Sequence, residues 1–322
     1  MKPSLGTMAS WLAEFSRVPF RQRALVTGGS GFIGSHLCRA LALLGAEVYA
    51  CSRGTVRAPL PTGCRPVSLD LADLPAVQET LKGVRPSLIF HLAGFVTGRP
   101  DLELIVPMLR ANLIGTVNLL IAAQSCRCQR IVVACSSEEP VSITTGPPPS
   151  SPYAASKAAA TLYARMFQAA YGLPVVCVRL FHTFGPGQDR SKLVPYAVSE
   201  VLAGRAPRIL SGQRVCDFIY VLDVVRGLLK AGVQAGVEGE IFDLGCGRGT
   251  TIREVVQLIA ELCGGNVTPV FEAASDRREQ PSQVADTRAA GERLGWQPGW
   301  PLTDGLAETI EWYRSCLGAP SG

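Results

Sequence analysis

This 322-residue chain has no block of lysine or arginine and no stripe in which basic and aromatic residues alternate. Its formal net charge is +5, from 31 lysine and arginine residues against 26 aspartate and glutamate residues. Proteins that bind nucleic acid concentrate positive charge on one face or in one segment. The sequence therefore argues against a nucleic-acid partner, although a small anionic ligand such as a phosphate suits the modest positive balance.

Long apolar runs are also missing. No run reaches the ~20 residues that span a bilayer, and we expect no membrane association. The first twenty residues lack both the apolar core and the small-residue cleavage site of a secretory signal. We treat residues 1–19 as an N-terminal extension, or as the product of an upstream start with Met8 as the natural first residue.

The eleven cysteines form no ligand or disulfide pattern. Their number is odd, and several lie inside apolar runs that resemble strands. Cys126 and Cys128 are too close for ordinary metal-ligand spacing, and no histidine is near them. We expect reduced thiols, no metal site and a cytoplasmic location.

What is present is a globular composition, with 47% hydrophobic and 18% charged residues. Strand-like and helix-like segments alternate up to residue 181, which predicts an α/β fold with a Rossmann-type doubly wound parallel sheet. We expect a dinucleotide-binding domain over 20–181, to which segments near 218–245 return. A smaller mixed α/β C-terminal substrate lobe is expected over 182–217 and 246–317. The expected strands are 24–27, 47–51, 66–69, 87–91, 130–134 and 174–180.

A glycine-rich loop joins the first strand to the first helix. It has the spacing Gly-x-x-Gly-x-x-Gly and reads Gly28-Gly29-Ser30-Gly31-Phe32-Ile33-Gly34. Glycines allow a tight turn and let a pyrophosphate approach the backbone N–H groups of a helix N-terminus. Because the motif stands between a strand and a helix, we expect it to bind a dinucleotide.

The end of the second strand carries Ser52 and Arg53 where an acid would bind the ribose hydroxyls of NAD. Ser52 can donate a hydrogen bond and Arg53 can pair with a 2′-phosphate, so we favour NADP over NAD. The alternative is that Arg53 stacks on the adenine and either cofactor binds. Further residues at strand ends are expected to converge on the same cofactor: Asp70, which could accept from the adenine amine, Leu71, Leu92, Ala93 and Gly94.

Tyr153 and Lys157 lie one helical turn apart on an alanine-rich helix expected over 153–170, which Pro152 opens. A neighbouring cation favours the ionised phenol and lowers its pKa. The pair is therefore suited to acid–base work, although an exposed helix face could carry the same spacing.

Taken together, these motifs resemble the extended short-chain dehydrogenase/reductase family, in its nucleotide-sugar epimerase/dehydratase branch. The resemblance spans roughly residues 23–317. Besides the glycine loop, Tyr153 and Lys157, it is carried by His91-Leu92-Ala93-Gly94, Ser136-Ser137, Arg179-Leu180-Phe181, Gly185-Pro186-Gly187-Gln188, Asp217-Phe218-Ile219-Tyr220-Val221 with Asp223, and Leu294-Gly295-Trp296 with Pro298.

The resemblance implies that Tyr153 exchanges a proton with a sugar hydroxyl as hydride moves between the sugar and a nicotinamide. Lys157 would bind the nicotinamide ribose, and Ser137 would hydrogen-bond the reacting oxygen. Dehydratases of this branch have an acid pair after that residue, and Glu138 and Glu139 stand there. One acid could protonate a leaving hydroxyl while a base removes the proton beside the new ketone, or only one glutamate faces the substrate.

Some family positions differ. The usual Tyr-Gly after the acid pair is replaced by Pro140-Val141-Ser142. The family usually has an arginine where this chain has Cys216, and Arg214, two residues away, could replace it. The expected diphosphate contacts are therefore His182, Arg214 and Arg278. The resemblance also implies a homodimer through helices 107–125 and 153–170, with Leu120, Leu162 and Met166 facing outward.

Three interpretations follow. The first is an NAD(P)-dependent nucleotide-sugar epimerase or 4,6-dehydratase that oxidises a carbon, expected to be C4, and returns the hydride. The second is an NADPH-dependent nucleotide 4-keto-sugar reductase, which Ser52 and Arg53 favour because they suit NADPH; the acid pair does not exclude it, since related 4-keto-sugar reductases also carry a glutamate after the Ser/Thr. The third is a non-catalytic dinucleotide-binding protein. The sugar, the nucleotide base and the stereochemical outcome stay open.

Overall fold

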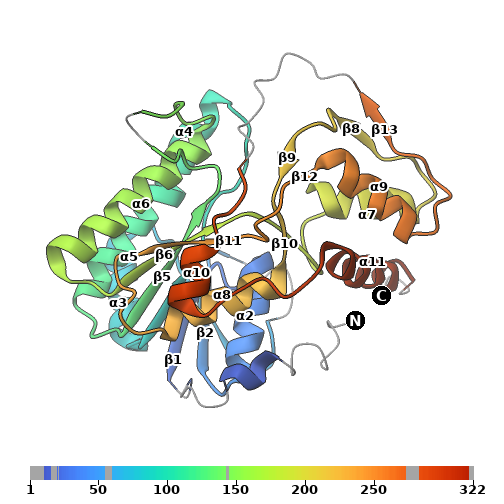
Figure 1. Ribbon diagram of the computed structural model, residues 1–322. Helices are drawn as coiled ribbons and strands as arrows, with labels where there is room; N and C mark the ends of the chain where they lie inside the picture. The colour runs from blue at the N-terminus through green and yellow to red at the C-terminus, as the bar shows by residue number, and fades with distance from the viewer. Residues whose placement is uncertain are drawn as a thin grey trace.

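The computed structural model describes residues 11–15, 20, 22–54, 60–142, 145–272 and 283–318. Its centre is a seven-stranded sheet in the order β11-β6-β5-β4-β1-β2-β3 (Figure 1). Every pairing in this sheet is parallel. The predicted Rossmann-type sheet is thus confirmed. The strands are β1 (Arg23–Thr27), β2 (Glu47–Ser52), β3 (Cys64–Ser68), β4 (Leu88–His91), β5 (Arg130–Ser136), β6 (Val175–Leu180) and β11 (Ile241–Leu244).

The strand order reverses between β1 and β4, which lie side by side although β2 and β3 come between them in the chain. In such sheets ligands bind beyond the carboxyl ends of the strands at this switch point. β3 begins two residues earlier than the sequence suggested, at Cys64, and pairs with β2 through Ser68. The loops after β1, β2, β4, β5 and β6 therefore share one edge of the sheet.

Helices cover both faces of the sheet, because alternate strand residues bury to opposite sides. Leu25, Ile89 and Val133 belong to one core, and Val26 and Phe90 belong to the other. The first core is covered by α3 (Leu74–Val84), α5 (Gly115–Gln124) and α6 (Pro152–Tyr171), and the second by α2 (Phe32–Leu43) and α8 (Val221–Val233).

Helix α6 has clear start and stop signals. The hydroxyl of Ser151 accepts a hydrogen bond from the backbone N–H of Ala154 at 3.1 Å, and Pro152 occupies the first turn. Gly172 ends the helix in the left-handed conformation, with φ 66°. The helix is therefore held at both ends, and Tyr153 falls in its first turn.

The expected helix over 107–125 is interrupted. It consists of α4 (Ile105–Met108), a π-helical segment (Leu109–Ile114) and α5, after a 3₁₀ turn, η2 (Leu102–Leu104). The stretch Leu102–Gln124 is long and apolar enough to cross a membrane by length and composition, so the expectation that no segment reaches that length is not met here. Its α5 part contacts α3 and α6 over the sheet, as a core helix does.

The second lobe lies at the upper right of Figure 1. It contains α7 (Leu193–Leu202), α9 (Ile252–Leu262) and the strand pairs β8 (Arg208–Leu210) with β13 (Val270–Glu272) and β9 (Val215–Cys216) with β12 (Thr250–Thr251). The remaining described elements are η1 (Ala13–Phe15), β7 (His182–Phe184), β10 (Phe218–Tyr220), α10 (Arg288–Leu294) and α11 (Leu302–Gly318). Within the motif Asp217-Phe218-Ile219-Tyr220-Val221, β10 covers the middle three residues and α8 begins at Val221.

Two buried carboxylates fasten the loops of this half of the chain. Asp217 accepts backbone hydrogen bonds from Cys246 (2.6 Å), Gly247 (2.9 Å) and Ala285 (3.1 Å). Asp223 accepts from Gly299 and Trp300, both at 2.9 Å. A buried charge is tolerated when backbone N–H groups satisfy it. Both aspartates of the Asp-Phe-Ile-Tyr-Val motif therefore have structural partners.

Candidate active site

The glycine-rich loop leaves no room for side chains. Gly28 has φ +70°, and a Cβ there would lie 2.9 Å from the backbone nitrogen of Ala93. A Cβ at Gly34 would lie 2.1 Å from the carbonyl oxygen of Gly28. The N-cap of α2, Gly31, makes no side-chain capping bond, so the first N–H groups of the helix are free for an anionic ligand. This cradle fits the pyrophosphate of a dinucleotide.

The other loop residues anchor the helix behind the cradle. Phe32 meets His36 edge to face at 5.8 Å between ring centroids, and Ile33 packs against the core on that face of the sheet. His36 is hydrogen-bonded through Nε2 to the carbonyl of Pro186 at 2.8 Å. Ser30 makes no contact that assigns it a role. The loop is thus tied to the 185–188 turn that leads into the second lobe.

The residues predicted to bind adenosine lie at the ends of β2 and β3. The Ser52 hydroxyl donates to the carbonyl of Gly54 at 3.3 Å, and Arg53 is exposed. Asp70 pairs with Arg110 at 3.3 Å, and the backbone N–H of Ala72, then Arg110 and Arg53, lower the pKa of its carboxyl. Leu71 is buried, and its carbonyl accepts from Asn118 at 2.9 Å. No acid stands at the end of β2, where Ser52 is the last residue of the strand.

A buried polar network connects β1 to β4 beneath Leu92, Ala93 and Gly94. The Thr27 hydroxyl pairs with Nδ1 of His91 at 2.7 Å, and Thr116 pairs with Nε2 at 2.8 Å. The backbone N–H of Ala93 donates to the Thr27 hydroxyl at 3.2 Å, which fixes the loop against Gly28. Burial, and secondarily the Lys157 charge, lowers the pKa of His91 to about 3. His91 is therefore a neutral structural residue at neutral pH.

Tyr153 and Lys157 are both buried at the end of β5, which brings the predicted pair to the carboxyl edge of the sheet. The Lys157 ammonium donates to the carbonyl oxygen of Ala134 on β5. The Tyr153 phenol is hydrogen-bonded to Ser136, a residue that we did not predict for this role. Ser137 is buried beside it, and its backbone N–H donates to the Leu180 carbonyl at 3.0 Å. The contact of its hydroxyl with a substrate stays a prediction.

The acidity of Tyr153 differs from our expectation. Burial raises the pKa of the phenol above its usual value, the Ser136 hydrogen bond opposes the rise, and the charges of Glu138 and Glu139 add to it. Lys157 is not among the groups that shift this pKa. The expected lowering by Lys157 is therefore wrong for the chain alone, because desolvation exceeds any effect of the ammonium. The phenol is a proton donor at neutral pH.

The two glutamates of the acid pair have different environments. Glu139 is 4% exposed, and its carboxylate accepts from the backbone N–H of Ser136 at 2.7 Å and from the Thr161 hydroxyl at 2.8 Å. It therefore fastens β5 to α6. Glu138 has a buried carboxylate oxygen without a partner, and burial raises its pKa while Arg214 and Lys192 oppose the rise.

The predicted diphosphate contacts gather around Glu138. Burial, and then Arg214, lowers the pKa of His182 to about 4, and its Nδ1 is buried without a partner. The ring meets Phe218 at 5.6 Å between centroids. Nε of Arg214 is also buried without a partner. A buried polar atom without a partner in the described part of the chain needs an explanation, and the phosphate of a substrate is one that both donors could bind. Arg278, the third predicted contact, lies outside the described residues.

Asn112 is a residue whose place the helical pattern did not reveal. It lies in the π-helical segment, where its amide nitrogen donates to Ser156 at 3.0 Å and to the Phe95 carbonyl at 3.1 Å. Its amide oxygen accepts from the backbone N–H of Phe95 at 2.7 Å. π-helical turns often mark functional sites. In the sequence, the only sign of this role was that Asn112 is a polar residue inside the apolar stretch 105–124.

Comparison with known proteins gives the same assignment. The model of the NAD dependent epimerase/dehydratase family matches residues 24–245. A dTDP-glucose 4,6-dehydratase of Actinoplanes is 31% identical over 319 residues, covering 91% of this chain and 98% of the relative. A UDP-glucose 4-epimerase of Mycolicibacterium smegmatis is also 31% identical, covering 91% of this chain and 99% of the relative.

Solved structures agree with these relatives. The UDP-glucose 4-epimerase of Thermotoga maritima, solved with UDP-glucose, has a TM-score of 0.85 and 28% identity, covering 92% of this chain and 99% of that one. The UDP-glucose 4-epimerase of Thermus thermophilus, solved with NAD, has a TM-score of 0.79 and 30% identity. The match covers 91% of this chain and 99% of that one. With its glycine cradle and its Tyr153–Lys157 pair at one edge of the sheet, the chain belongs to the NAD dependent epimerase/dehydratase family of nucleotide-sugar enzymes.

Proposed function

We propose that the chain is a 4,6-dehydratase acting on a hexose linked to a nucleoside diphosphate. Relatives of equal identity include a 4,6-dehydratase and a 4-epimerase, so similarity alone does not separate the two reactions. Both begin with the transient oxidation of a sugar carbon, which we assign to C4. Only the dehydratase must also remove water, and that step needs an acid and a base in addition to Tyr153.

The observation that carries the proposal is the free carboxylate oxygen of Glu138. It is buried and has no partner among the residues that the structure describes, and it lies close enough to Tyr153 for its charge to raise the pKa of the phenol. A 4-epimerase needs no such group beside its tyrosine, because the proton and the hydride return to the carbon and oxygen that they left. An unpaired buried carboxyl costs stability, so its retention is explained by a proton transfer.

The roles of the residues follow from these positions. A bound nicotinamide dinucleotide, held at Gly28, Gly31 and Gly34, supplies the hydride acceptor and later the hydride donor. Tyr153 would take the proton of the C4 hydroxyl as a phenolate, a form that the positive charge of a bound nicotinamide would favour over the protonated phenol of the chain alone. Ser136 and Ser137 lie beside the reacting oxygen. Glu138 removes the proton from C5, and the same proton then leaves with the C6 hydroxyl as water.

A single glutamate can serve both halves of this elimination. The proton that Glu138 accepts from C5 makes it the acid that the departing C6 hydroxyl needs, so the step balances without a second carboxyl. The double bond between C5 and C6 then receives the returning hydride at C6 and, at C5, the proton that Tyr153 took from the C4 hydroxyl, which gives a 4-keto-6-deoxy sugar. Glu139 takes no part, since both of its oxygens already accept hydrogen bonds.

The test is product analysis without added cofactor beyond what the purified enzyme retains. Incubation with dTDP-glucose and with UDP-glucose should yield a product lighter by one water, detected by mass spectrometry. A product of unchanged mass and altered stereochemistry would establish the 4-epimerase, our second candidate. A requirement for stoichiometric NADPH and a 4-keto substrate would identify a reductase instead and would refute the redox-neutral proposal.

The cofactor preference is a separate proposal. The chain presents Ser52 and the exposed Arg53 where an acid would repel a 2′-phosphate, and this supports NADP as the tighter ligand. The Thermus epimerase, by contrast, was solved with NAD. Binding of the two dinucleotides, measured by calorimetry, decides between them.

We also propose a homodimer formed by the α4–α5 and α6 helices. Exposed apolar side chains there include Val106 (72%), Ile114 (46%), Leu162 (47%) and Met166 (37%), whereas the predicted Leu120 is fully buried. Large exposed apolar patches support protein–protein contact. The molar mass from light scattering tests this proposal.

All eleven cysteines lie within the described residues and are unpaired, which supports a reducing, cytoplasmic location.

A further inference from the structure

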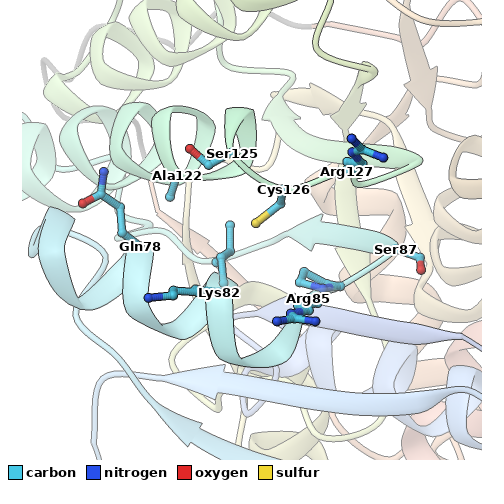
Figure 2. A pocket seen from close by; sticks show the side chains of 10 residues that line it. Gln78, Lys82, Arg85, Ser87, Ala122, Ser125, Cys126 and Arg127 are labelled. Carbon is cyan, nitrogen blue, oxygen red and sulfur yellow. The ribbon is translucent and has the colours of Figure 1, made fainter.

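A cavity of about 490 Å³ lies between α3 and α5, far from the candidate active site (Figure 2). Ser87, on its wall, precedes β4, and Arg127 precedes β5. The cavity therefore opens at the amino ends of these strands, whereas Gly28 and Ser137 follow the carboxyl ends of β1 and β5. Its volume falls within the range of small-molecule sites.

The charges around the cavity have one sign. Lys82, Arg85 and Arg127 line it, and no aspartate or glutamate does. Among the described residues none of these three cations forms an ion pair, whereas Arg110, Arg130 and many other arginines of the chain have a carboxylate partner. Cations that share one concave surface without a counter-charge create a local positive potential and attract anions.

Arg85 has a backbone conformation that its side chain does not favour. It ends α3 with φ 48° and ψ 59°, in the left-handed region. The corresponding residues of α6 and α10 are Gly172 and Gly295. The left-handed conformation is unfavourable for a residue with a Cβ. An arginine side chain is thus placed on the cavity wall by a backbone conformation that favours glycine.

The rest of the lining is partly polar, through Gln78, Ser87 and Ser125, and partly apolar. Leu81 and Pro86 contribute from the α3 side and Ala122 from α5, and Figure 2 shows the Cys126 sulfur directed toward the space between the two helices. Burial raises the pKa of the Cys126 thiol, so the thiol is neutral at neutral pH and adds to the apolar surface. A ligand that fits this lining has an anionic part and an apolar, ring-sized part.

We propose that this cavity is a second binding site, which takes a nucleoside phosphate through Lys82, Arg85 and Arg127. The planar guanidinium groups match the oxygen geometry of phosphate, and the ammonium adds a point charge. The base lies against the apolar wall and Cys126. The site is separate from the dinucleotide cradle, so it holds its ligand while the active site is occupied.

Protection of Cys126 tests the proposal on the full-length enzyme. The alkylation rate of each cysteine by N-ethylmaleimide is measured by peptide mass spectrometry, with UTP, inorganic tripolyphosphate or no ligand present. UTP is expected to slow the alkylation of Cys126 in a saturable way, while Cys263, on the second lobe, reacts at an unchanged rate. No protection by millimolar UTP would overturn the proposal, and protection by tripolyphosphate alone would contradict the nucleoside part.

Variants separate this site from the active site. The double variant Lys82→Ala/Arg127→Ala is expected to raise the half-protecting UTP concentration at least tenfold, with turnover of the sugar nucleotide retained. Arg65→Ala/Arg314→Ala removes two exposed charges elsewhere and should leave protection unchanged. Arg85→Gly relieves the strained backbone, so it should weaken protection without lowering the thermal midpoint. Equal protection in all three variants would refute the assignment.

Discussion

The position of Glu139 leads to the sharpest prediction. Its carboxylate joins the end of β5 to α6 by accepting from the Ser136 N–H and the Thr161 hydroxyl, at 2.7 and 2.8 Å. We therefore expect Glu139→Gln to keep most of the catalytic rate, whereas Glu138→Gln should lose about 10²–10⁴-fold, the usual contribution of a general acid or base.

The effect on stability can be worked out from the same contacts. A glutamine at 139 can still accept from the Ser136 N–H with its oxygen and donate to the Thr161 hydroxyl with its nitrogen. Only the charge is lost, and the expected cost is about 1 kcal/mol. Glu139→Ala instead leaves the buried Ser136 N–H without a partner and the Thr161 hydroxyl with only the Cys135 sulfur at 3.0 Å, at a cost of roughly 1–3 kcal/mol or more. Chemical denaturation of the two variants should rank them in this order.

A double-mutant cycle isolates the contact with α6. Thr161→Val preserves the shape of the side chain but leaves one oxygen of Glu139 unpaired. The coupling free energy between Glu139→Gln and Thr161→Val should lie in the range of about 0.5–3 kcal/mol that contacting residues show. The matched Glu138→Gln/Thr161→Val pair should show no coupling, because no hydrogen bond joins those residues.

Turnover and accumulation of reduced nicotinamide provide the assay. In Glu138→Gln the C4 oxidation remains possible, so reduced nicotinamide should accumulate by absorbance while water loss stops. In Glu139→Gln both signals should resemble the parent. A stable Glu139→Gln enzyme that loses a hundredfold or more in kcat would refute the structural role and would assign Glu139 a catalytic role.

Three further predictions concern the cofactor site and pH. Gly34→Ala should abolish dinucleotide binding or folding, seen by calorimetry and circular dichroism, because its Cβ would lie 2.1 Å from the Gly28 carbonyl oxygen. Arg53→Ala should weaken NADP binding about tenfold or more and leave NAD binding nearly unchanged, and an equal loss for both would contradict the 2′-phosphate contact. The pKa of His91 is about 3 in the folded chain against 6.5 for an unperturbed histidine, so the unfolded chain binds the extra proton. Stability should thus fall as pH drops from 6.5 toward 3, by at most about 1.4 kcal/mol per pH unit, and His91→Gln should flatten this dependence in urea titrations.

Much of the fold could be predicted, because its signals are local. The spacing of Gly28, Gly31 and Gly34 between a strand and a helix implies the cradle, and Ser151-Pro152 and Gly172 mark the two ends of α6. The π-helical turn at Leu109–Ile114 could not be predicted, since the apolar pattern around it also fits a regular helix. The outward face of α5 was assigned wrongly at Leu120, next to the exposed Ile121, because one residue rotates a helix position by about 100°.

The candidate site was also only partly predictable from the sequence. The types and order of Tyr153, Lys157 and the two glutamates could be recognised, because each follows a strand end or lies within one helical turn. Their directions could not, because the turn after β5 decides them. In that turn the Glu139 N–H donates to the Ser136 carbonyl at 3.1 Å, which sends its side chain back to the strand. Whether the pKa of Tyr153 rises or falls depends on how deeply the phenol is buried, and residue spacing does not reveal burial.

The buried carboxylates of the chain show why Glu138 stands apart. Glu139, Asp217 and Asp223 accept a hydrogen bond on both oxygens, and each ties one loop or helix to another. Such groups cannot exchange a proton without breaking the fold. The Glu138 oxygen holds nothing in place, and its proton affinity is raised beside a phenol whose own proton is held tightly. A dehydration needs such a group, which can take the proton from C5 and pass it to the departing C6 hydroxyl without loosening the fold.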